Sequence, residues 1–588
     1  ADFHARAMKL TLALSLSAFT AAAHAASCPP VKTAVTSLPG VKGPLVSKTY
    51  TGFLDAGVAP AGPSAGSLCF HYWMVESEGN PAKDPVLIWY NGGPGASSLF
   101  GMLQEFGPYM LTEKSFDAAY DATGIPSPKL NPYRWSLNHT IIAIDSPPPM
   151  GLSFCANAGP SGNATSCGPW RDSTVFAANH RAHKAFFTTA FPELKTNPVY
   201  FVGESYAGIY VPGFVDAMMK DMVPGLNLQG MMVGDGWTGC KMPHHHDHHE
   251  APVPADFCID LDNVGLLKYP NANAGPWYDV NFFHGHSQFS EELFHKIMDD
   301  CDEAMLMGDT PLTGTCAILI HEMSDEVGDW FAYNLFNQCP DDEMRRRRLG
   351  NGDAGNGGAG GFDHLAQHFA GEASPPRHFD SHGIWKSKRA RKLAAHQLTS
   401  RAGKGEHSLS GLSSPCLGDA LPQWLLLNAT LEAIGAPAGS SFINLDNGHG
   451  FNYTSDQAFV GDIYTRALAK GLRTLVYEGD NDACGLSTVP VEDVFVSHFK
   501  SIDLNKTQRW RPWTIDGERT LGGYVIEWED GQAMFVSIRG SGHLAPLNRP
   551  RAALKLISTF TAGKGNHLPP LMPAPSPPPS GDSTRHGL

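Results

Sequence analysis

The sequence predicts an α/β fold in which helices flank a central, mostly parallel β-sheet and a mainly helical cap is inserted into the chain. Short apolar runs rich in β-branched and aromatic residues recur and stop near Gly, Asn, Asp or Ser, as buried strands do where they meet loops. Helical patterns separate several of these runs, which favours βαβ units. Strand signals fade between residues 239 and 425, where helix-prone segments with cysteines take over.

Five apolar runs are the expected strands of the sheet. Each has the length of a strand and lies next to turn-forming residues. Apolar residues at helical spacing before and after the third run predict helices over 173–189 and 211–222, which would complete a βαβ unit. The expected strands are residues 86–90, 140–144, 199–202, 474–477 and 534–538.

The cap divides one sheet domain into two parts. The α/β domain is expected over residues 27–238 and again over 426–562, on either side of a cap at 239–425. Inside the cap, the patterns at 291–307 and 318–333 predict helices.

Two segments have the composition of mobile chain. Residues 341–414 contain four consecutive arginines, a glycine-rich stretch and a second basic run, which predicts a flexible excursion. This excursion is either a processing site for proteases that cut after basic residues or a solvated loop. The proline-rich C-terminal segment, 563–588, is expected to be disordered.

Three features predict passage through the secretory pathway, towards a vacuole, a lysosome or the extracellular space. Residues 8–25 have a charged flank, an apolar core and small residues before a cleavage point, as a signal peptide does. The chain has 11 cysteines without CxxC pairs, which favours disulfides over zinc and leaves at least one thiol unpaired in a monomer. Asn-x-Ser/Thr sequons make glycosylation candidates of Asn138, Asn163, Asn428, Asn452 and Asn505.

Charge and hydropathy exclude two classes of partner. Asp and Glu number 58 against 43 Lys and Arg, and the resulting net charge of −15 repels nucleic acids. No apolar run reaches the ~20 residues that a membrane-spanning helix needs, so no membrane anchor is expected.

The third expected strand leads into a candidate nucleophile. The run GESYAG at 203–208 is a relaxed form of G-x-S-x-G, in which Gly203 and Ala207 are the small residues around Ser205. A nucleophilic serine needs a strand-to-helix turn of this kind, because only small neighbours allow the sharp backbone that lifts its hydroxyl above the sheet. Ser205 is therefore the predicted nucleophile.

An acid and a histidine follow the last two expected strands. Asp482 ends the run EGDND, and His543 lies in GSGHLAP. Because parallel strands bring their carboxyl ends to one edge of a sheet, both side chains should reach Ser205. The order Ser, Asp, His is that of α/β-hydrolases, where the histidine takes the serine proton and the acid fixes its tautomer. We therefore predict an α/β-hydrolase fold with a Ser205–Asp482–His543 triad.

A glycine-rich turn, WYNGGPGASS at 89–98, follows the first expected strand. Consecutive glycines let backbone N–H groups approach a tetrahedral oxyanion. The N–H of Gly93 is the expected first donor, and that of Tyr206, directly after the nucleophile, the second.

These segments together resemble the serine carboxypeptidase family. Its hallmarks W-x-N-G-G-P-G-x-S-S, G-E-S-Y-A-G, G-D-x-D and G-x-G-H-x-x-P occur at 89–98, 203–208, 479–482 and 540–546. The resemblance covers roughly residues 48 to 560 apart from the cap excursion. It implies an α/β-hydrolase that removes C-terminal residues from peptides and proteins through an acyl-enzyme intermediate.

The resemblance also assigns a grip on the substrate's terminal carboxylate. In the family, the Asn of the glycine turn and the Glu before the nucleophile hold this group, which implies Asn91 and Glu204 here, with Trp89 nearby. A glutamic acid can hydrogen-bond a carboxylate only while one of the two keeps its proton, so binding should weaken as pH rises. An acidic optimum is therefore expected.

Several departures from the family pattern matter. Ala96 stands where many members have Cys, so the disulfide often made there must be absent. Pro149 replaces a glycine of a loop that shapes the family's substrate pocket, so the side-chain preference is not transferred. Cys484 is the candidate for the unpaired thiol; a buried inert thiol and a further disulfide partner are the alternatives.

The expected partners are the C-termini of peptides and proteins, without a cofactor, and a homodimer stays open. The histidine-rich run at 244–250 is expected to be a solvated cap loop and not a metal site, because a serine triad needs no metal. Other functions on the same framework are acyl transfer to a hydroxyl instead of water, ester hydrolysis, and non-catalytic binding. Retention of Asn91 and Glu204 favours the peptidase.

Overall fold

The structure is a computed structural model that describes residues 27–239, 276–306, 310, 312–327, 333–336, 419–445, 451–457, 459–483 and 488–571. The predicted signal peptide (8–25), the histidine-rich run (244–250), the basic excursion (341–414) and Cys484 lie outside these ranges.

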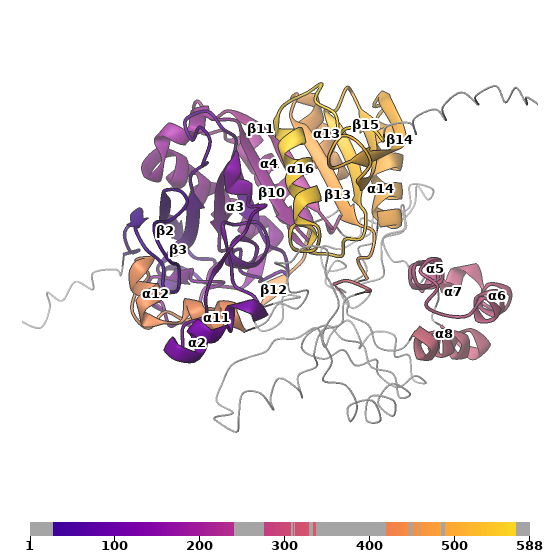
Figure 1. The fold of residues 1–588 in the computed structure, drawn as a ribbon, viewed down its shortest axis with the longest axis horizontal. Helices are drawn as coiled ribbons and strands as arrows, with labels where there is room; N and C mark the ends of the chain where they lie inside the picture. Colours follow the sequence, from indigo (N-terminus) through magenta and orange to yellow (C-terminus); the bar gives the residue numbers. More distant parts are fainter. Residues whose placement is uncertain are drawn as a thin grey trace, which may run out of the picture.

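A twelve-stranded sheet forms the centre of the molecule (Figure 1). Eleven strands follow one another across the sheet, and β8 (Phe154–Cys155) pairs with the third of them. Their order is β1 (Thr33–Val35), β2 (Thr49–Val58), β3 (Ser67–Val75), β7 (Thr140–Ile144), β4 (Val86–Tyr90), β10 (Val199–Glu204), β11 (Leu228–Gly234), β13 (Arg473–Gly479), β16 (Ala533–Ile538), β15 (Leu521–Trp528) and β14 (Lys506–Thr514).

The central strands, from β7 to β16, are parallel. β4, β7, β10, β13 and β16 are buried along their whole length, which is why they read as unbroken apolar runs in the sequence. These are the five expected strands, and β11 is a further one. The outer strands pair antiparallel, so the sheet is mixed.

Helices cover both faces of this sheet, and alternate residues of β4 point into two different cores. Val86, Ile88 and Tyr90 pack with α3 (Asp172–Ala185), α4 (Ala207–Lys220), α13 (Gly461–Ala469) and α14 (Thr488–Ser501). Leu87 and Trp89 pack with α16 (Pro550–Thr561) on the other face. α3 and α4 correspond to the two helices expected around the third strand; α3 begins one residue before its predicted start, and α4 begins four residues before (173 − 172 and 211 − 207).

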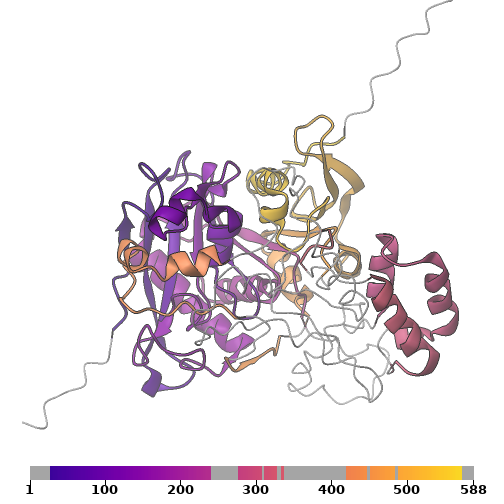
Figure 2. The same cartoon turned by 60° about the horizontal axis from the view of Figure 1, so that its bottom comes forward.

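The inserted segment contains a separate group of helices, which Figures 1 and 2 both show beside the sheet. It has its own apolar core and the disulfide Cys301–Cys316. Ala483, next to Asp482, belongs to this core, so the insert packs at the end of β13. The helices are α5 (Trp277–Gly285), α6 (Glu291–Asp300), α7 (Glu303–Leu306) and α8 (Gly314–Val327).

α11 (Ala420–Leu425) lies within the range expected for the cap but packs on the sheet. The Trp424 ring lies 6.4 Å from that of Trp73, and Trp424 Nε1 donates to the Pro39 carbonyl at 2.9 Å. Together with α12 (Asn428–Ala433), this apolar helix covers the core that contains Leu87 and Trp89, which we call the second core.

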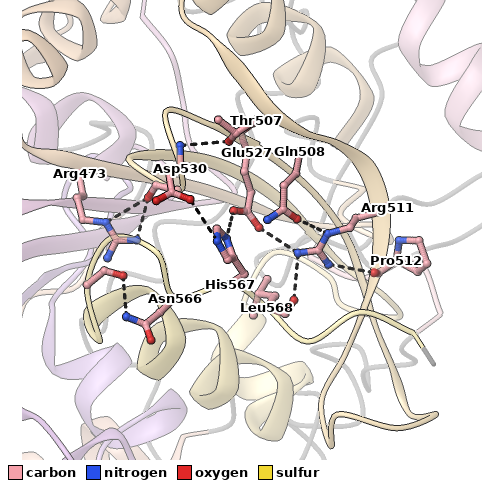
Figure 3. A network of polar contacts seen from close by, with 12 residues as sticks. Arg473, Thr507, Gln508, Arg511, Pro512, Glu527, Asp530, Asn566, His567 and Leu568 are labelled. Atoms are coloured by element: carbon pink, nitrogen blue, oxygen red, sulfur yellow. Dashed lines mark hydrogen bonds and ion pairs between the residues drawn. The ribbon is translucent and has the colours of Figure 1, made fainter.

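The expectation of disorder from residue 563 onwards is wrong for 563–571. Leu568 is buried in the second core, and Thr514 N–H donates to the Pro569 carbonyl at 2.8 Å. Figure 3 shows the polar contacts that hold this segment: the buried carboxylate of Glu527 accepts from Arg511 Nη2 at 3.1 Å and lies 2.6 Å from His567 Nδ1. Apolar and ion-pairing residues within the proline-rich segment therefore fix its first part against β14 and β15.

Six of the cysteines pair in three disulfides, Cys28–Cys69, Cys155–Cys167 and Cys301–Cys316. The five other cysteines lie outside the ranges that the structure describes.

Candidate active site

The predicted catalytic residues follow three parallel strands of the central sheet. Ser205 comes directly after β10, Asp482 follows β13, and His543 follows β16. β11 lies between β10 and β13, and β16 is the next strand on. The three side chains therefore start from the same edge of the sheet.

Ser205 occupies a sharp turn between β10 and α4. Its φ of 61° is in the left-handed region that side chains rarely adopt. Ser205 N–H donates to the Gly234 carbonyl at 3.0 Å, and the Ser205 carbonyl accepts from Trp237 N–H at 2.9 Å. A Cβ on Gly203 would come within 2.6 Å of the Ala207 Cβ, so larger residues do not fit. These contacts fix the strained backbone, which leaves the serine half-buried.

Asp482 and His543 contact each other directly. His543 Nδ1 lies 2.7 Å from Asp482 Oδ2, and the exposed fractions of the two residues are 2% and 0%. A carboxylate at Nδ1 holds the proton there and leaves Nε2 as the basic nitrogen. The insert supports both loops, since His543 N–H donates to the Tyr333 carbonyl at 2.8 Å and Leu335 N–H donates to the Asn481 carbonyl at 3.0 Å.

The glycine turn after β4 lies directly against the nucleophile's turn. A Cβ on Gly92 would be 2.3 Å from Tyr206 N and 2.8 Å from Ser205 Cβ, so only glycine allows this approach. Gly93 has a φ of 109°, again a conformation that favours glycine. The Tyr206 hydroxyl donates to Asp172 Oδ1 at 2.8 Å and fixes the residue after the serine. The structure thus brings together the two backbones predicted to bind an oxyanion.

Trp89, Asn91 and Glu204 form one chain of hydrogen bonds. Trp89 Nε1 donates to Asn91 Oδ1 at 2.7 Å, and Gly101 N–H donates to the same oxygen at 3.0 Å. Asn91 Nδ2 then donates to Glu204 Oε1 at 2.8 Å. All three side chains are buried, so the orientation of the amide is fixed beside the nucleophile's turn.

Glu105 joins this group and was missed in the sequence. It ends the short helix η2 (Gly101–Glu105), is 1% exposed, and faces Glu204 and Asn91. Burial raises the pKa of Glu105 to about 7, and burial together with the charge of Glu105 raises the pKa of Glu204 well above its usual range. No N–H or O–H of the described residues donates to Glu204 Oε2, the oxygen of Glu204 that Asn91 does not bind. Two acceptor-only carboxyls in contact require a proton between them.

A signal for Glu105 exists in the sequence. It is the single acid within the apolar run LFGMLQEF at 99–106, and an unpaired acid in such a run is costly to bury unless it has a task.

The asparagines of all five sequons are exposed, although Thr140 and Thr430, which complete two of these sequons, are buried. Asn138 Nδ2 donates a hydrogen bond to Ser558 Oγ at 2.9 Å.

Known proteins are similar in sequence to this chain over most of its length. Residues 39–563 match the model of the serine carboxypeptidase family. The chain is 28% identical over 540 residues to serine carboxypeptidase 1 of Hordeum vulgare, covering 90% of this chain and 92% of that protein. It is 27% identical over 541 residues to the lysosomal protective protein of Mus musculus, with 89% and 92% covered.

Among solved structures, the chain is similar to Kex1(delta)p, a prohormone-processing carboxypeptidase from Saccharomyces cerevisiae. The TM-score is 0.55 at 14% identity, covering 91% of this chain and 96% of the other, which supports the α/β-hydrolase fold. The family match extends over most of the described sheet, its helices and the site at its edge, and the chain therefore belongs to the serine carboxypeptidase family.

Proposed function

We propose that this protein is a serine-type carboxypeptidase that removes C-terminal residues from peptides and proteins at acidic pH. The observation that carries the proposal is the buried Asn91–Glu204–Glu105 group, which directly adjoins the nucleophile's turn. An amide donor and a carboxyl pair with a proton can bind a carboxylate, and Glu204 precedes Ser205 in the chain. A substrate held there by its terminal carboxylate would present its last peptide bond to Ser205.

The reaction follows from the roles of the groups at the sheet edge. His543 Nε2 takes the Ser205 proton as Oγ attacks the carbonyl carbon, and the N–H groups of Gly93 and Tyr206 stabilise the oxyanion. The imidazolium then gives its proton to the leaving amine, which departs as the free C-terminal amino acid. Water, deprotonated by the same imidazole, hydrolyses the acyl-enzyme and restores Ser205.

The acidic optimum has a physical basis in the Glu105–Glu204 pair. While the pair keeps a proton, it donates to the substrate carboxylate; once that proton is lost, two negative charges repel it. The raised pKa of Glu105 extends the range in which the proton is kept to about pH 7. KM should therefore rise with pH.

We also propose that the protein travels the secretory pathway to a vacuole, a lysosome or the cell exterior. The three disulfides suit an oxidising compartment, and one relative is named a lysosomal protein. None of the helices in the described ranges is long and apolar enough to cross a bilayer.

The first experiment is an assay of amino-acid release from N-blocked dipeptides across a pH series. We expect release that is strongest in acid, absent in Ser205→Ala and lost when the substrate C-terminus is amidated. Absence of release by folded wild-type protein would overturn the proposal, and activity with acyl-glucose donors and alcohol acceptors would instead assign acyl transfer.

A further inference from the structure

A second pair of buried carboxyls lies at the ends of β11 and β13, the two strands that follow β10 across the sheet. Asp235 follows β11 directly and has a φ of 44°, and Glu478 lies near the end of β13. Both residues are 0% exposed. Neither takes part in the catalytic steps proposed above, yet side-chain atoms of Asp235, Asp482 and His543 all lie within 4.8 Å of one another.

The two carboxyls join the ends of the strands from which they come. Asp235 N–H donates to the Tyr477 carbonyl at 2.8 Å, and Gly479 N–H donates to Asp235 Oδ1 at 2.7 Å. In the other direction, Gly236 N–H donates to Glu478 Oε1 at 3.3 Å. Each carboxyl thus uses one oxygen to hold the backbone at the end of the other strand.

Both catalytic loops are hydrogen-bonded to these braced positions. Ser205 N–H donates to the carbonyl of Gly234, the residue before Asp235. Asp482 N–H donates to the carbonyl of Gly479 at 3.2 Å. The brace between β11 and β13 therefore connects the nucleophile's turn with the acid's loop.

The second oxygen of each carboxyl, Asp235 Oδ2 and Glu478 Oε2, receives no N–H or O–H donor from the described residues. Neither residue takes part in an ion pair that the described part of the chain contains. The titratable groups that face the pair are Glu204 from β10, Tyr477 from β13, Tyr464 from α13, Asp482 and His543.

Burial first, and then the neighbouring carboxylates, raise the pKa of both Asp235 and Glu478 well above the usual range. Each group is an influence on the other, so the two titrate together. Two buried acceptor oxygens without a donor or a cation are stable only when a proton lies between the carboxyls.

We propose that Asp235 and Glu478 share one proton and act as positioning residues, which brace the Ser205 turn against the Asp482 loop and set the pH range in which His543 is a base. With one proton the pair carries a single negative charge close to the Asp482–His543 couple. That charge stabilises the imidazolium and fixes the pH below which His543 stops accepting a proton. Loss of the shared proton adds a second negative charge beside Asp482. The repulsion between these carboxylates destabilises the arrangement of the catalytic loops.

The catalytic part of this inference rests on the proposed function, but it does not use the carboxylate grip. The test substrate is accordingly an N-blocked amino-acid ethyl ester, which has no free carboxylate and needs only the triad and the oxyanion donors. The variants are Asp235→Asn, Glu478→Gln and the double variant, because amides keep the size of the side chains and the carbonyl oxygens that accept from Gly479 and Gly236.

Each single variant carries the same charge as the wild-type pair and is therefore the control for the double variant. In a single variant the new amide donates to the remaining carboxylate, so the pair keeps one negative charge. The acidic limb of the pH profile, which is the fall of kcat/KM at low pH, should therefore stay at the same pH. In the double variant the charge is gone, and that limb should move to lower pH by about one unit. All three variants lack the second ionisation, so activity should persist to higher pH than in the wild type.

Glu527→Gln is the control for removing a buried carboxylate elsewhere in the sheet, within the network of Figure 3. It should leave the acidic limb unchanged. Identical acidic limbs for the wild type and the double variant, or equal shifts in the single and double variants, would overturn the proposal.

A second measurement needs no catalysis and separates this inference from the proposed function. A carboxyl pair whose pKa is raised by folding stabilises the folded protein in acid and loses that contribution as pH rises. The melting temperature of Ser205→Ala should therefore fall more steeply from pH 5 to pH 8 than that of Ser205→Ala with both amide substitutions. Equal slopes would show that no proton is shared, whether or not the wild type cleaves peptides.

Discussion

Asn91 Nδ2 lies 2.8 Å from Glu204 Oε1, so the amide from the glycine turn and the acid before the nucleophile are one hydrogen-bonded unit. The other end of the amide is fixed by Trp89 and Gly101, which leaves it a single orientation.

Glu204→Ala should raise KM for blocked dipeptides at pH 5 by about 10- to 100-fold, because the side chain that donates a hydrogen bond to the charged substrate carboxylate is removed. kcat/KM for an N-blocked ethyl ester should change little, since this substrate has no terminal carboxylate. Steady-state kinetics with the two substrates measure the difference. Equal losses on both would mean that Glu204 supports the turn and not the substrate.

Asp482→Asn should reduce kcat by about 10⁴-fold, because an amide in place of the carboxylate favours the wrong tautomer of His543. The side chain keeps its size, so circular dichroism should match the wild type. A variant with near-normal kcat would assign the orienting role to another acid of this edge.

Gly92→Ala should lower kcat by about 100-fold, since the added Cβ meets Tyr206 N at 2.3 Å and pushes the two turns apart. Gly285→Ala is the matched control, because a Cβ there has no atom within 4 Å. Kinetics of the two variants on one ester substrate give the comparison. A Gly92→Ala enzyme as active as its control would contradict the close packing of the two turns.

Glu105→Gln should flatten the dependence of stability on pH. Folding raises the pKa of Glu105 from 4.5 to about 7, so its contribution is complete below pH 4.5 and is lost as pH rises through 7. Urea unfolding at several pH values measures this free energy. The wild type should lose stability between pH 5 and 8, and the variant should lose less; parallel curves would place the proton elsewhere.

Removing the disulfide Cys301–Cys316 with two serine substitutions should loosen the α5–α8 group by about 3 kcal/mol, because the bridge closes a loop with a sequence separation of 15. Hydrogen exchange should accelerate in α6 and α8 while β4 and β10 stay protected. Equal acceleration in the sheet would mean that the insert and the sheet unfold as one unit.

The sequence predicts the centre of the fold well and its margins poorly. β4 and β7 are buried on both faces, so their apolar runs have the bounds that the structure gives. β11 contains Gln229 and Gly230, and β2 mixes polar with apolar residues, so neither has a clear pattern. Burial of Leu568 depends on contacts with distant strands, which local composition does not record.

The residues of the site also divide into those that a sequence motif predicts and those that it does not. Ser205, Asp482 and His543 lie in short motifs at strand ends, and the structure places all three at one edge. Glu105 and Glu478 have no motif of their own. Their importance arises from two carboxyls meeting in three dimensions, which spacing along the chain cannot indicate.

The pairing of β11 with β13 also bears on biosynthesis. Ser205 precedes this junction, whereas Asp482 and His543 follow it by way of β13 and β16, 277 and 338 residues later in the chain (482 − 205 and 543 − 205). A growing chain that has already folded its first strands holds a serine without a base. On the proposed mechanism, the chain therefore cannot act before β16 and the loop that follows it have been synthesised.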